Sequence, residues 1–291
     1  MNLENIPNFD NFNKINSSIP DDKVLLISDI AKMVKSSGDR FSIGFNILDE
    51  AMDGGLKEGD LMVISGISGE GKTSLSQTIT YNLTKKGIAC LWFSYEMTIE
   101  QLHKKFISMG IEEHYEAYAP VRAITGQLSW IKDKIKEGWI KYACKVIFID
   151  HIDFLIPYEV KNSDSREVLL KNITTQLKSL AIELKVVIVL MAHLKKLEKD
   201  REPDMQDIGY SAGIFQIPDY VIIISREKIK NKKMGEEYGE IATNNSKIKI
   251  VKNRQTGSLK FLKVSYTNGK FIEITNRYEE PPMSKMDYLN K

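Results

Sequence analysis

Short apolar runs alternate with longer amphipathic segments through most of the chain. Runs rich in Val, Ile and aromatic residues predict strands, and they lie at Leu61–Ser65, Ala89–Ser94, Val146–Asp150, Val186–Ala192, Tyr220–Ser225, Lys247–Lys252 and Leu259–Tyr266. Segments with apolar residues at helical spacing predict helices, and they lie at Ser74–Lys86, Thr98–Met109, Leu128–Glu137 and Arg166–Leu184. The alternation predicts an α/β fold with a mostly parallel central sheet flanked by helices, extended by antiparallel C-terminal strands.

The two ends of the sequence have a different character. Residues 1–40 predict an N-terminal arm and a linker helix, because an Asn-rich stretch precedes apolar residues that fall on one side of a helix ending at Gly38. This helix could pack on its own domain or on a neighbouring subunit, and the pattern leaves both open. Residues 41–277 predict one domain, and residues 278–291 predict a flexible tail.

The stretch after the first predicted strand points to phosphate chemistry. Residues 66–73, GISGEGKT, fit G-x-x-x-x-G-K-T between a predicted strand and a predicted helix. Glycines let backbone N–H groups turn toward an anion, and the helix start adds its positive end. A glycine turn without a ligand is the alternative, and the order of strand, loop and helix favours a nucleotide site. The phosphate-binding residues are then expected to be Gly66, Ser68, Gly69, Glu70, Gly71, Lys72, Thr73 and Ser74.

Three residues give this site its expected chemistry. Lys72 would reach the β- and γ-phosphates of a nucleoside triphosphate, and the Thr73 hydroxyl would bind Mg²⁺. The run Val146–Asp150 ends in an acid, and an acid at the carboxyl end of a central strand lies at the mouth of such a site. Asp150 is therefore expected to hold Mg²⁺ as well.

Glu96 follows another strand end, and two interpretations of it are open. A carboxylate beside the γ-phosphate could position or deprotonate water. Alternatively, Glu96 could simply begin the helix predicted from Thr98, because acids are favoured at helix starts.

Composition narrows the expected surroundings. The formal net charge is only +2, so no global basic field indicates nucleic acid. Cys90 and Cys144 lie in or beside apolar runs and indicate buried thiols. No run approaches the ~18–20 apolar residues of a membrane span, and the N-terminus lacks a signal-peptide pattern. We expect a cytoplasmic protein without a membrane partner. The four histidines show no metal-ligand spacing along the sequence.

Several motifs resemble the motor domain of DnaB-type replicative helicases, which belong to the RecA-like superfamily. The stretch FSYEM at 93–97 resembles the family's F-S-x-E-M element, and residues 42–60, SIGFNILDEAMDGGLKEGD, resemble its entry segment. Residues 250–266, IVKNRQTGSLKFLKVSY, resemble its closing pair of strands. The resemblance covers roughly residues 41–275 in order and implies a RecA-like P-loop NTPase core.

The resemblance also implies roles for individual residues. Glu96 would be the catalytic base and His193 the phosphate sensor, while Lys252 and Arg254 would reach the γ-phosphate of a neighbouring subunit. It implies ATP and Mg²⁺ as cofactors, and single-stranded DNA and other replication proteins as partners. It further implies a homo-oligomer, a ring of six subunits in this family. Only about 40 residues precede the motor pattern, so the primase-binding N-terminal domain of bacterial members is not expected in this sequence.

In this family the loops that line the central channel follow the strand of the metal-binding acid and the sensor strand. The resemblance therefore places single-stranded DNA near the basic residues of these loops, Lys161, Arg166, Lys195, Lys196 and Arg201. Acidic residues are interleaved with them, so charge alone describes solvated loops equally well. A further basic stretch, residues 226–239, is expected to be a solvated loop.

The leading functional expectation is an ATP-dependent, ring-forming DNA helicase that translocates on single-stranded DNA during replication. One alternative is a recombination or signalling ATPase of the RecA, RadA or KaiC kind. Another is an ATP-binding loader or regulator of a helicase. A helicase would unwind a forked duplex alone, a recombinase would pair strands, and a loader would act only with its partner.

Overall fold

The computed structural model describes residues 26–29, 38–111, 115–158, 160, 163–194, 211–231 and 239–274. Within the expected linker helix, only residues 27–29 are described, and they are helical. The remainder of that helix, the Asn-rich arm and the expected tail lie outside the described residues. None of the helices in the described ranges is long and apolar enough to cross a membrane.

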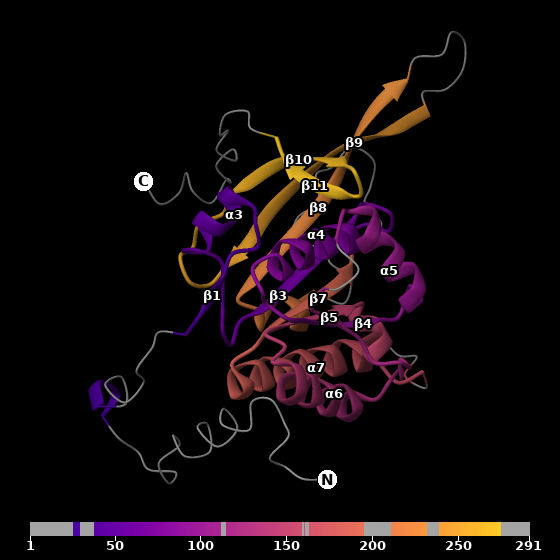
Figure 1. Ribbon diagram of the computed structural model, residues 1–291. Coiled ribbons are helices and arrows are strands. Elements are labelled where there is room, and N and C mark those ends of the chain that lie inside the picture. The colour runs from indigo at the N-terminus through magenta and orange to yellow at the C-terminus, as the bar shows by residue number, and fades with distance from the viewer. Residues whose placement is uncertain are drawn as a thin grey trace.

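A nine-stranded sheet forms the centre of the molecule, in the order β11-β10-β9-β8-β3-β7-β6-β4-β5 (Figure 1). Its parallel part consists of β8 (Tyr220–Asn231), β3 (Leu61–Gly66), β7 (Val187–His193), β6 (Val146–Asp150), β4 (Cys90–Ser94) and β5 (Ala117–Tyr118). Its antiparallel part consists of β9 (Gly239–Asn253), β10 (Phe261–Thr267) and β11 (Lys270–Glu273). The predicted α/β class, with a parallel sheet and an antiparallel extension, is confirmed.

Helices cover both faces of this sheet. The helices are α3 (Asn46–Ala51), α4 (Lys72–Thr84), α5 (Ile99–Ser108), α6 (Leu128–Tyr142), α7 (Ser163–Leu184) and α8 (Ser211–Gln216), with a 3-10 turn, η2, at Ile152–Leu155. In Figure 1, α4 and α5 lie on one side of the parallel strands, and α6 and α7 lie on the other. A two-stranded sheet of β1 (Arg40–Phe41) and β2 (Leu56–Lys57) flanks α3.

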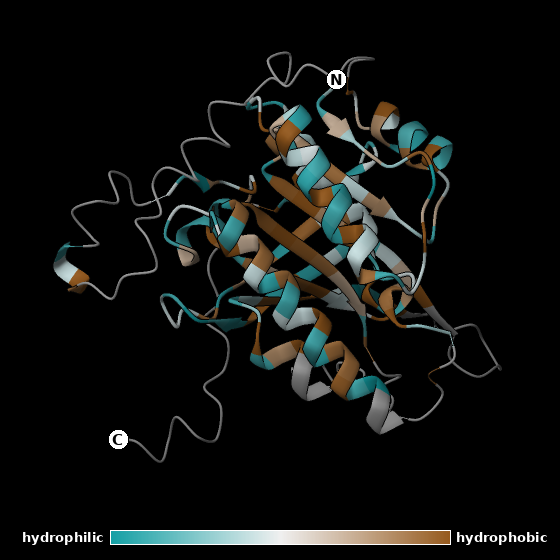
Figure 2. Cartoon of the chain, turned by 90° about the horizontal axis from the view of Figure 1, so that it is seen from below, coloured by the Kyte–Doolittle hydropathy of each residue, from teal (hydrophilic) through white to brown (hydrophobic). Residues whose placement is uncertain are grey.

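Two apolar cores result from this layering, because side chains alternate across each strand. Within β3, Met62 and Ile64 join the core under α4 and α5, whereas Leu61 and Val63 join the core under α6 and α7. The parallel strands are therefore apolar at nearly every position, as expected for strands buried on both faces. Figure 2 shows these hydrophobic strands between helices whose outer sides are largely hydrophilic.

The predicted elements match the structure closely, except at one place. Residues 226–239, which we expected to form a solvated loop, largely continue strands: β8 runs to Asn231, and β9 begins at Gly239. The expectation was wrong because this stretch is rich in lysine, whereas backbone pairing between the two strands satisfies its hydrogen bonds. The pairing reaches Asn231 opposite Gly239, and the ends of β8 and β9 project from the body as an arm (Figure 1).

The arm is held to the sheet by an irregular ladder. Its register shifts between Val221 and Ile222, and again between Arg226 and Lys228, and such bulges increase local twist. Beyond the second shift, Ile229 lies opposite Ile241, and the two residues are 60% and 50% exposed. The apolar pair was invisible as a strand signal because its neighbours are polar on both faces.

Trp92 is expected to be the largest single contributor to the core under α4 and α5. It is fully buried, stacks on Phe148 with ring centroids 4.8 Å apart, and donates from Nε1 to Oγ1 of Thr80 at 3.0 Å. Trp92→Phe removes the hydrogen bond and leaves a cavity, so it should lower the free energy of unfolding by about 2 kcal/mol. Urea unfolding followed by circular dichroism measures this, with Trp130→Phe at a half-buried position as the control. Equal costs for the two variants would contradict this ranking of Trp92.

Candidate active site

The predicted phosphate loop joins β3 to α4 at the carboxyl edge of the parallel strands. Gly71 has a φ of 105°, in the left-handed region that favours glycine. A Cβ atom on Gly71 would lie 2.9 Å from the ring of Phe271 in β11. The helix α4 begins at the next residue, Lys72, without a side-chain cap. Its first N–H groups therefore face the loop without intrahelical partners, together with the positive end of the helix.

The outer part of the loop is more open. Ser68 and Gly69 are exposed, and Ser74 lies in the first turn of α4. The carboxylate of Glu70 accepts a hydrogen bond from the backbone N–H of Arg226 in β8. This contact fastens the loop to the strand that leads into the projecting arm.

Lys72 is buried beneath the loop. Its Nζ donates to the carbonyl oxygens of Gly66 at 2.8 Å and Ile67 at 3.1 Å, and it lies 3.0 Å from Nδ1 of His193. An ammonium group can only donate, so Nδ1 of His193 accepts, and the proton of the neutral imidazole lies on Nε2. Burial lowers the pKa of His193, and the charge of Lys72 lowers it further, which favours this neutral ring.

Opposing effects act on the pKa of Lys72. Burial lowers it, whereas the charges of Glu96, Asp150 and Glu70 act to raise it, and the net shift is downward. The positive charge is thus surrounded by three acids without a direct ion pair to any of them within the described part of the chain. It is held instead by neutral acceptors, which a phosphate oxygen could replace.

Thr73 and Asp150 meet across the loop, as the sequence suggested. Oγ1 of Thr73 donates to Oδ2 of Asp150 at 2.7 Å. Asp150 is almost fully buried, and burial raises its pKa against the effect of the Thr73 hydrogen bond. Among the described residues, none hydrogen-bonds to Oδ1 of Asp150. A hydroxyl oxygen, a carboxylate and an unsatisfied carboxylate oxygen are the donors that Mg²⁺ prefers, so these residues fit that ion.

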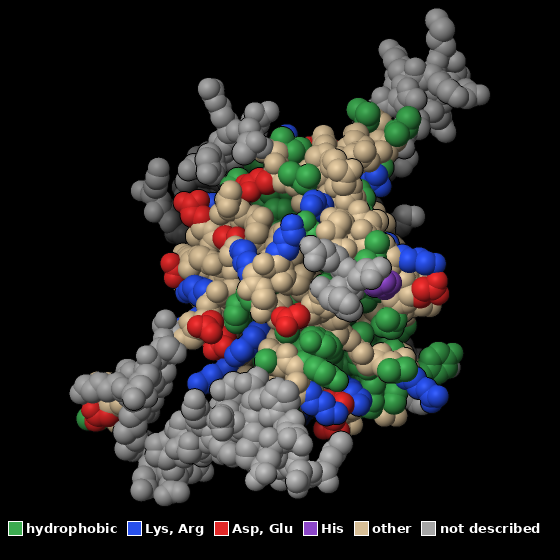
Figure 3. Space-filling view, in the orientation of Figure 1, with side chains coloured by type: hydrophobic (Ala, Val, Ile, Leu, Met, Phe, Trp, Pro, Cys, Tyr) green, Lys and Arg blue, Asp and Glu red, His purple; other side chains and the backbone are tan. Residues whose placement is uncertain are grey.

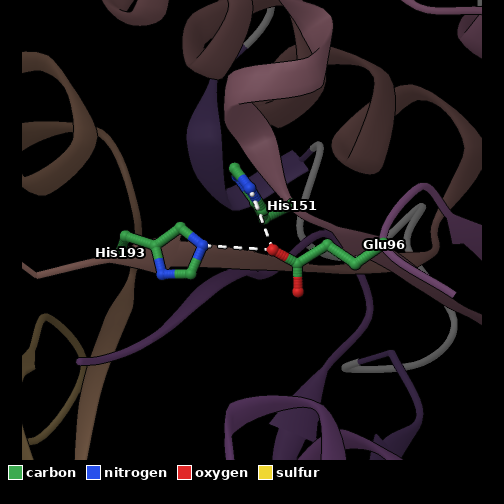
Figure 4. Close-up of side chains that lie close together, drawn as sticks. All are labelled: Glu96, His151 and His193. Carbon is green, nitrogen blue, oxygen red and sulfur yellow. Dashed lines mark hydrogen bonds and ion pairs between the residues drawn. The ribbon is translucent and has the colours of Figure 1, made fainter. Parts of the chain in front are cut away.

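Glu96 lies between two histidines at the ends of neighbouring strands (Figure 4). Its Oε1 lies 3.2 Å from Nε2 of His193 and 3.2 Å from Nε2 of His151. His193 is the last residue of β7, and His151 directly follows β6. The two rings are in edge contact, with centroids 4.4 Å apart. The arrangement fixes one oxygen of the carboxylate at the carboxyl edge, beside the phosphate loop.

The helix-start interpretation of Glu96 does not fit the structure. The N-cap of α5 is Thr98, whose hydroxyl accepts from the N–H of Gln101, and the Gln101 side chain accepts in turn from the Thr98 N–H. This capping box satisfies the helix start without Glu96. The glutamate is therefore available to the histidines.

His151 is a site residue that the sequence analysis missed. It follows the metal-site aspartate directly, and this adjacency was the only available signal. Its Nδ1 lies 3.3 Å from Oδ2 of Asp153, which also lies 3.5 Å from Arg166 through its other oxygen. Burial raises the pKa of Asp153, but His151 and Arg166 outweigh that effect and the net shift is downward. A line of polar groups thus runs from Lys72 to the start of α7.

Lys252 and Arg254 lie elsewhere, at the opposite edge of the sheet. Lys252 pairs with Val221 at the start of β8, whose neighbour Tyr220 lies beside Met62 near the start of β3. The phosphate loop follows the other end of β3, at Gly66, which is roughly 13 Å away along four strand residues. The pair is therefore not part of the constellation around its own Lys72.

Local contacts hold this pair together. Lys252 Nζ donates to the carbonyl oxygens of Phe215 and Gln216, and Arg254 also donates to Gln216 O at 2.7 Å. The Arg254 guanidinium lies 3.7 Å from Asp219. Burial and the neighbouring Arg254 lower the pKa of Lys252 to about 8. Two adjacent cations at an edge of the molecule are suited to a further anion.

Of the basic residues expected to contact DNA, Arg166 is described. It lines a hollow of about 810 Å³ together with Asp153, Phe154 and Tyr158. The other four residues, Lys161, Lys195, Lys196 and Arg201, lie outside the described residues. On the face drawn in Figure 3, basic and acidic side chains are interspersed rather than gathered in one stripe.

Comparison with known proteins identifies the family. The family model of the DnaB-like helicase C terminal domain matches residues 41–130 and 118–275. The replicative DNA helicase DnaC of Bacillus subtilis is 27% identical over 300 residues, which cover 90% of this chain and 63% of that protein. The replicative DNA helicase DnaB of Geobacillus stearothermophilus is 26% identical over 81% of this chain and 57% of its own length. The chain thus spans less than two thirds of these relatives.

Solved structures share the fold. A helicase-like ATPase domain that was solved on its own matches with a TM-score of 0.69 and 18% identity, over 85% of this chain and 96% of that domain. A DnaB-like replicative helicase, studied for its interactions with primase, matches with a TM-score of 0.68 and 20% identity, over 90% of this chain and 70% of that structure. From the match to the family model, which spans nearly all of the described fold, the chain belongs to the family of DnaB-like helicase C-terminal domains.

Proposed function

We propose that this chain is the ATP-hydrolysing motor of a replicative DNA helicase, which translocates on single-stranded DNA as a ring of identical subunits. One observation carries the proposal: within a DnaB-like fold, Glu96 lies beside the phosphate loop and is bridged to Lys72 through His193. A base, a phosphate-binding cation and a connecting imidazole are the parts that nucleoside triphosphate hydrolysis needs. The family match directs this chemistry toward DNA unwinding.

In the proposed reaction, Lys72 exchanges its carbonyl acceptors for oxygens of the β- and γ-phosphates. This exchange replaces neutral acceptors by charged ones, so it favours nucleotide binding. Thr73 and Asp150 would hold Mg²⁺, which when bound neutralises charge on the phosphates. The remaining loop residues would surround the phosphates with backbone N–H groups.

Glu96 would act as the general base that takes a proton from the attacking water. The two histidines occupy Oε1, and no described residue hydrogen-bonds to Oε2, which leaves that oxygen as the acceptor for water. His193 accepts from Lys72 at Nδ1 and donates to Glu96 at Nε2. When Lys72 moves to a phosphate, His193 loses a donor, so the position of the base would respond to the state of the nucleotide. His193 would act as a sensor in this way.

Lys252 and Arg254 would serve the next subunit. They are too far along the sheet to serve their own phosphate loop, whereas a head-to-tail ring brings one edge of each subunit to the opposite edge of its neighbour. An arginine supplied in this way stabilises charge that develops on the transferred phosphoryl group. A hexamer is the ring size that we propose from the family. Single-stranded DNA would run past the loops that contain Arg166 and the four basic residues outside the described ranges.

Two alternatives are distinguishable from a helicase. A recombination or signalling ATPase would use the same phosphate site, and a helicase loader would need a partner for activity. The relatives compared above are replicative helicases, which supports unwinding over both alternatives. The relative studied for its interactions with primase suggests primase as one replication partner to test.

Unwinding of a forked DNA duplex by the purified protein with ATP and Mg²⁺ tests the proposed function directly. We expect strand separation that depends on ATP hydrolysis and on a single-stranded tail. A fluorescence assay of strand separation measures it, beside Glu96→Gln protein as the inactive control. ATP hydrolysis without unwinding, but with strand pairing, would support the recombination alternative instead.

Glu96→Gln should separate nucleotide binding from hydrolysis. Glutamine keeps the size of the side chain and an oxygen that can accept from the histidines, but it cannot take a proton from water. The kcat for ATP should fall at least about 100-fold, while the affinity for a fluorescent ATP analogue stays within a few-fold of the wild type. Glu100→Gln, an exposed acid on α5 that pairs with Lys104, is the matched control and should keep its kcat. Normal turnover in Glu96→Gln would remove Glu96 from the reaction.

Arg254→Ala should abolish turnover without preventing ATP binding, because its own phosphate site is intact. The loss should be about 10³-fold in kcat. Mixing Arg254→Ala with Lys72→Ala protein should restore part of the activity, because some interfaces then join an intact lysine to an intact arginine. Steady-state ATPase assays of the mixtures measure this, after subunit exchange has been verified by labelled protein. Mixtures as inactive as either variant alone would rule out action on a neighbouring subunit.

A further inference from the structure

Glu96, His151 and His193 place three potential metal ligands at one point of the sheet edge. Their ligand atoms all lie within 4.8 Å of one another. Both contacts from Glu96 Oε1 to an imidazole Nε2 measure 3.2 Å. Zinc ligands in a tetrahedral site are separated by roughly 3.4 Å, given metal–ligand bonds of about 2.0–2.2 Å. Two of the three separations therefore already match a metal site.

We propose that these three residues bind a transition-metal ion of the Zn²⁺ class, distinct from the Mg²⁺ expected at Thr73 and Asp150. Two imidazoles and one carboxylate form a ligand set used by zinc and other first-row metals, with further positions open to water. Mg²⁺ prefers oxygen ligands, and the pair Thr73 and Asp150 offers only oxygen. Two adjacent sites of different ligand chemistry would select different ions.

The backbone holds the ligands in place without the metal. His193 ends β7 and His151 follows β6, and these strands pair with each other. Glu96 lies two residues beyond β4, which pairs with β6 so that Ser94 lies opposite Asp150. Three neighbouring parallel strands thus deliver one ligand each to the same edge. Binding would require only the closing of the gap between the two imidazoles.

His151 also has the support that metal-bound histidines need. Its second ring nitrogen, Nδ1, lies 3.3 Å from the carboxylate of Asp153. A carboxylate that accepts from the distal N–H of a histidine fixes the ring and strengthens the ligand nitrogen. Asp153 is in turn held near Arg166, at 3.5 Å, and its pKa is lowered in spite of burial. The carboxylate therefore stays ionised and able to play this part.

Lys72 opposes the metal. Its ammonium group donates to Nδ1 of His193, which keeps the ring proton on Nε2. A metal on Nε2 requires that proton on Nδ1, where it would face the lysine. Metal binding would therefore displace Lys72 from His193, toward its contacts with Gly66 and Ile67 or toward a phosphate. Lys72 should make the metal bind more weakly than the ligand set alone would allow.

A metal in this site would hold the carboxylate that we propose as the base. On the proposed function, Zn²⁺ would then inhibit hydrolysis without displacing the nucleotide. This consequence depends on the role of Glu96, whereas the binding site does not. Direct metal binding in the absence of nucleotide is therefore the primary test, and inhibition is a separate one.

The experiment is a Zn²⁺ titration of the tag-free full chain by calorimetry, in buffer with excess Mg²⁺, supported by the visible absorption of Co²⁺ as a stand-in for Zn²⁺. We expect one Zn²⁺ per chain that Mg²⁺ does not displace. His151→Gln should weaken binding by more than about 100-fold, because the loss of a supporting residue alone costs about 10–100-fold. Asp153→Asn should weaken it by about 10-fold or more.

Two further variants serve as controls for the fold and for the local charge. His103→Gln, a histidine on α5 that bonds to the Tyr115 hydroxyl, should bind Zn²⁺ like the wild type. Lys72→Met should bind it roughly tenfold more tightly, because a positive charge close to a divalent ion is removed. A merely misfolded variant would not gain affinity. His193→Gln replaces His151→Gln if circular dichroism shows that the latter does not fold.

Absence of Zn²⁺ binding by the wild type would overturn the proposal. So would equal affinity in the wild type and in folded variants that lack either histidine. Tight binding with an ATPase that Zn²⁺ leaves unchanged would keep the metal site and would instead contradict the proposed role of Glu96 as the base. The two failures are thus distinguishable.

Discussion

Adjacent parallel strands that end at a common edge are the constraint on which this site depends. β3, β7, β6 and β4 are consecutive neighbours in the sheet, and each ends in, or leads directly to, a polar residue of the site. The register pairs Gly66 with His193 and Ser94 with Asp150. Hydrogen bonding along the strands therefore sets the distances between side chains that are up to 121 residues apart in sequence. A slip of one residue in any strand would turn its polar end toward a core.

The charges at this edge are arranged so that none is fully neutralised by a single partner. Lys72 is held by carbonyl groups and an imidazole, Asp150 by a threonine hydroxyl, and Glu96 by two imidazoles. Burial disfavours the charged forms of Lys72 and Asp150. Such a site is poised to accept a ligand that is itself charged, because the ligand supplies the partners that the protein withholds.

Much of the fold and of the phosphate loop could be predicted from the sequence, because both follow from short-range patterns. Apolar runs predict the strands, and glycine spacing before Lys72 predicts the loop. The pairing of Glu96 with His151 could not be predicted in the same way, since it depends on which strands are neighbours. Likewise, the projecting arm of β8 and β9 lacks apolar alternation, and only the cross-strand pairing reveals it. The position of Lys252 and Arg254 relative to Lys72 depends on the direction of β9 against β3, which the sequence pattern does not contain.

The separation of Lys252 and Arg254 from the phosphate loop has a consequence for assembly. On the proposed function, each chain carries the two halves of an active site on opposite edges, so one chain alone holds two halves that cannot meet. An open row of subunits would leave one unmatched half at each end, whereas a closed ring leaves none. Closure would then be a condition for every site to be complete, and catalytic output per chain would depend on protein concentration as steeply as the assembly itself.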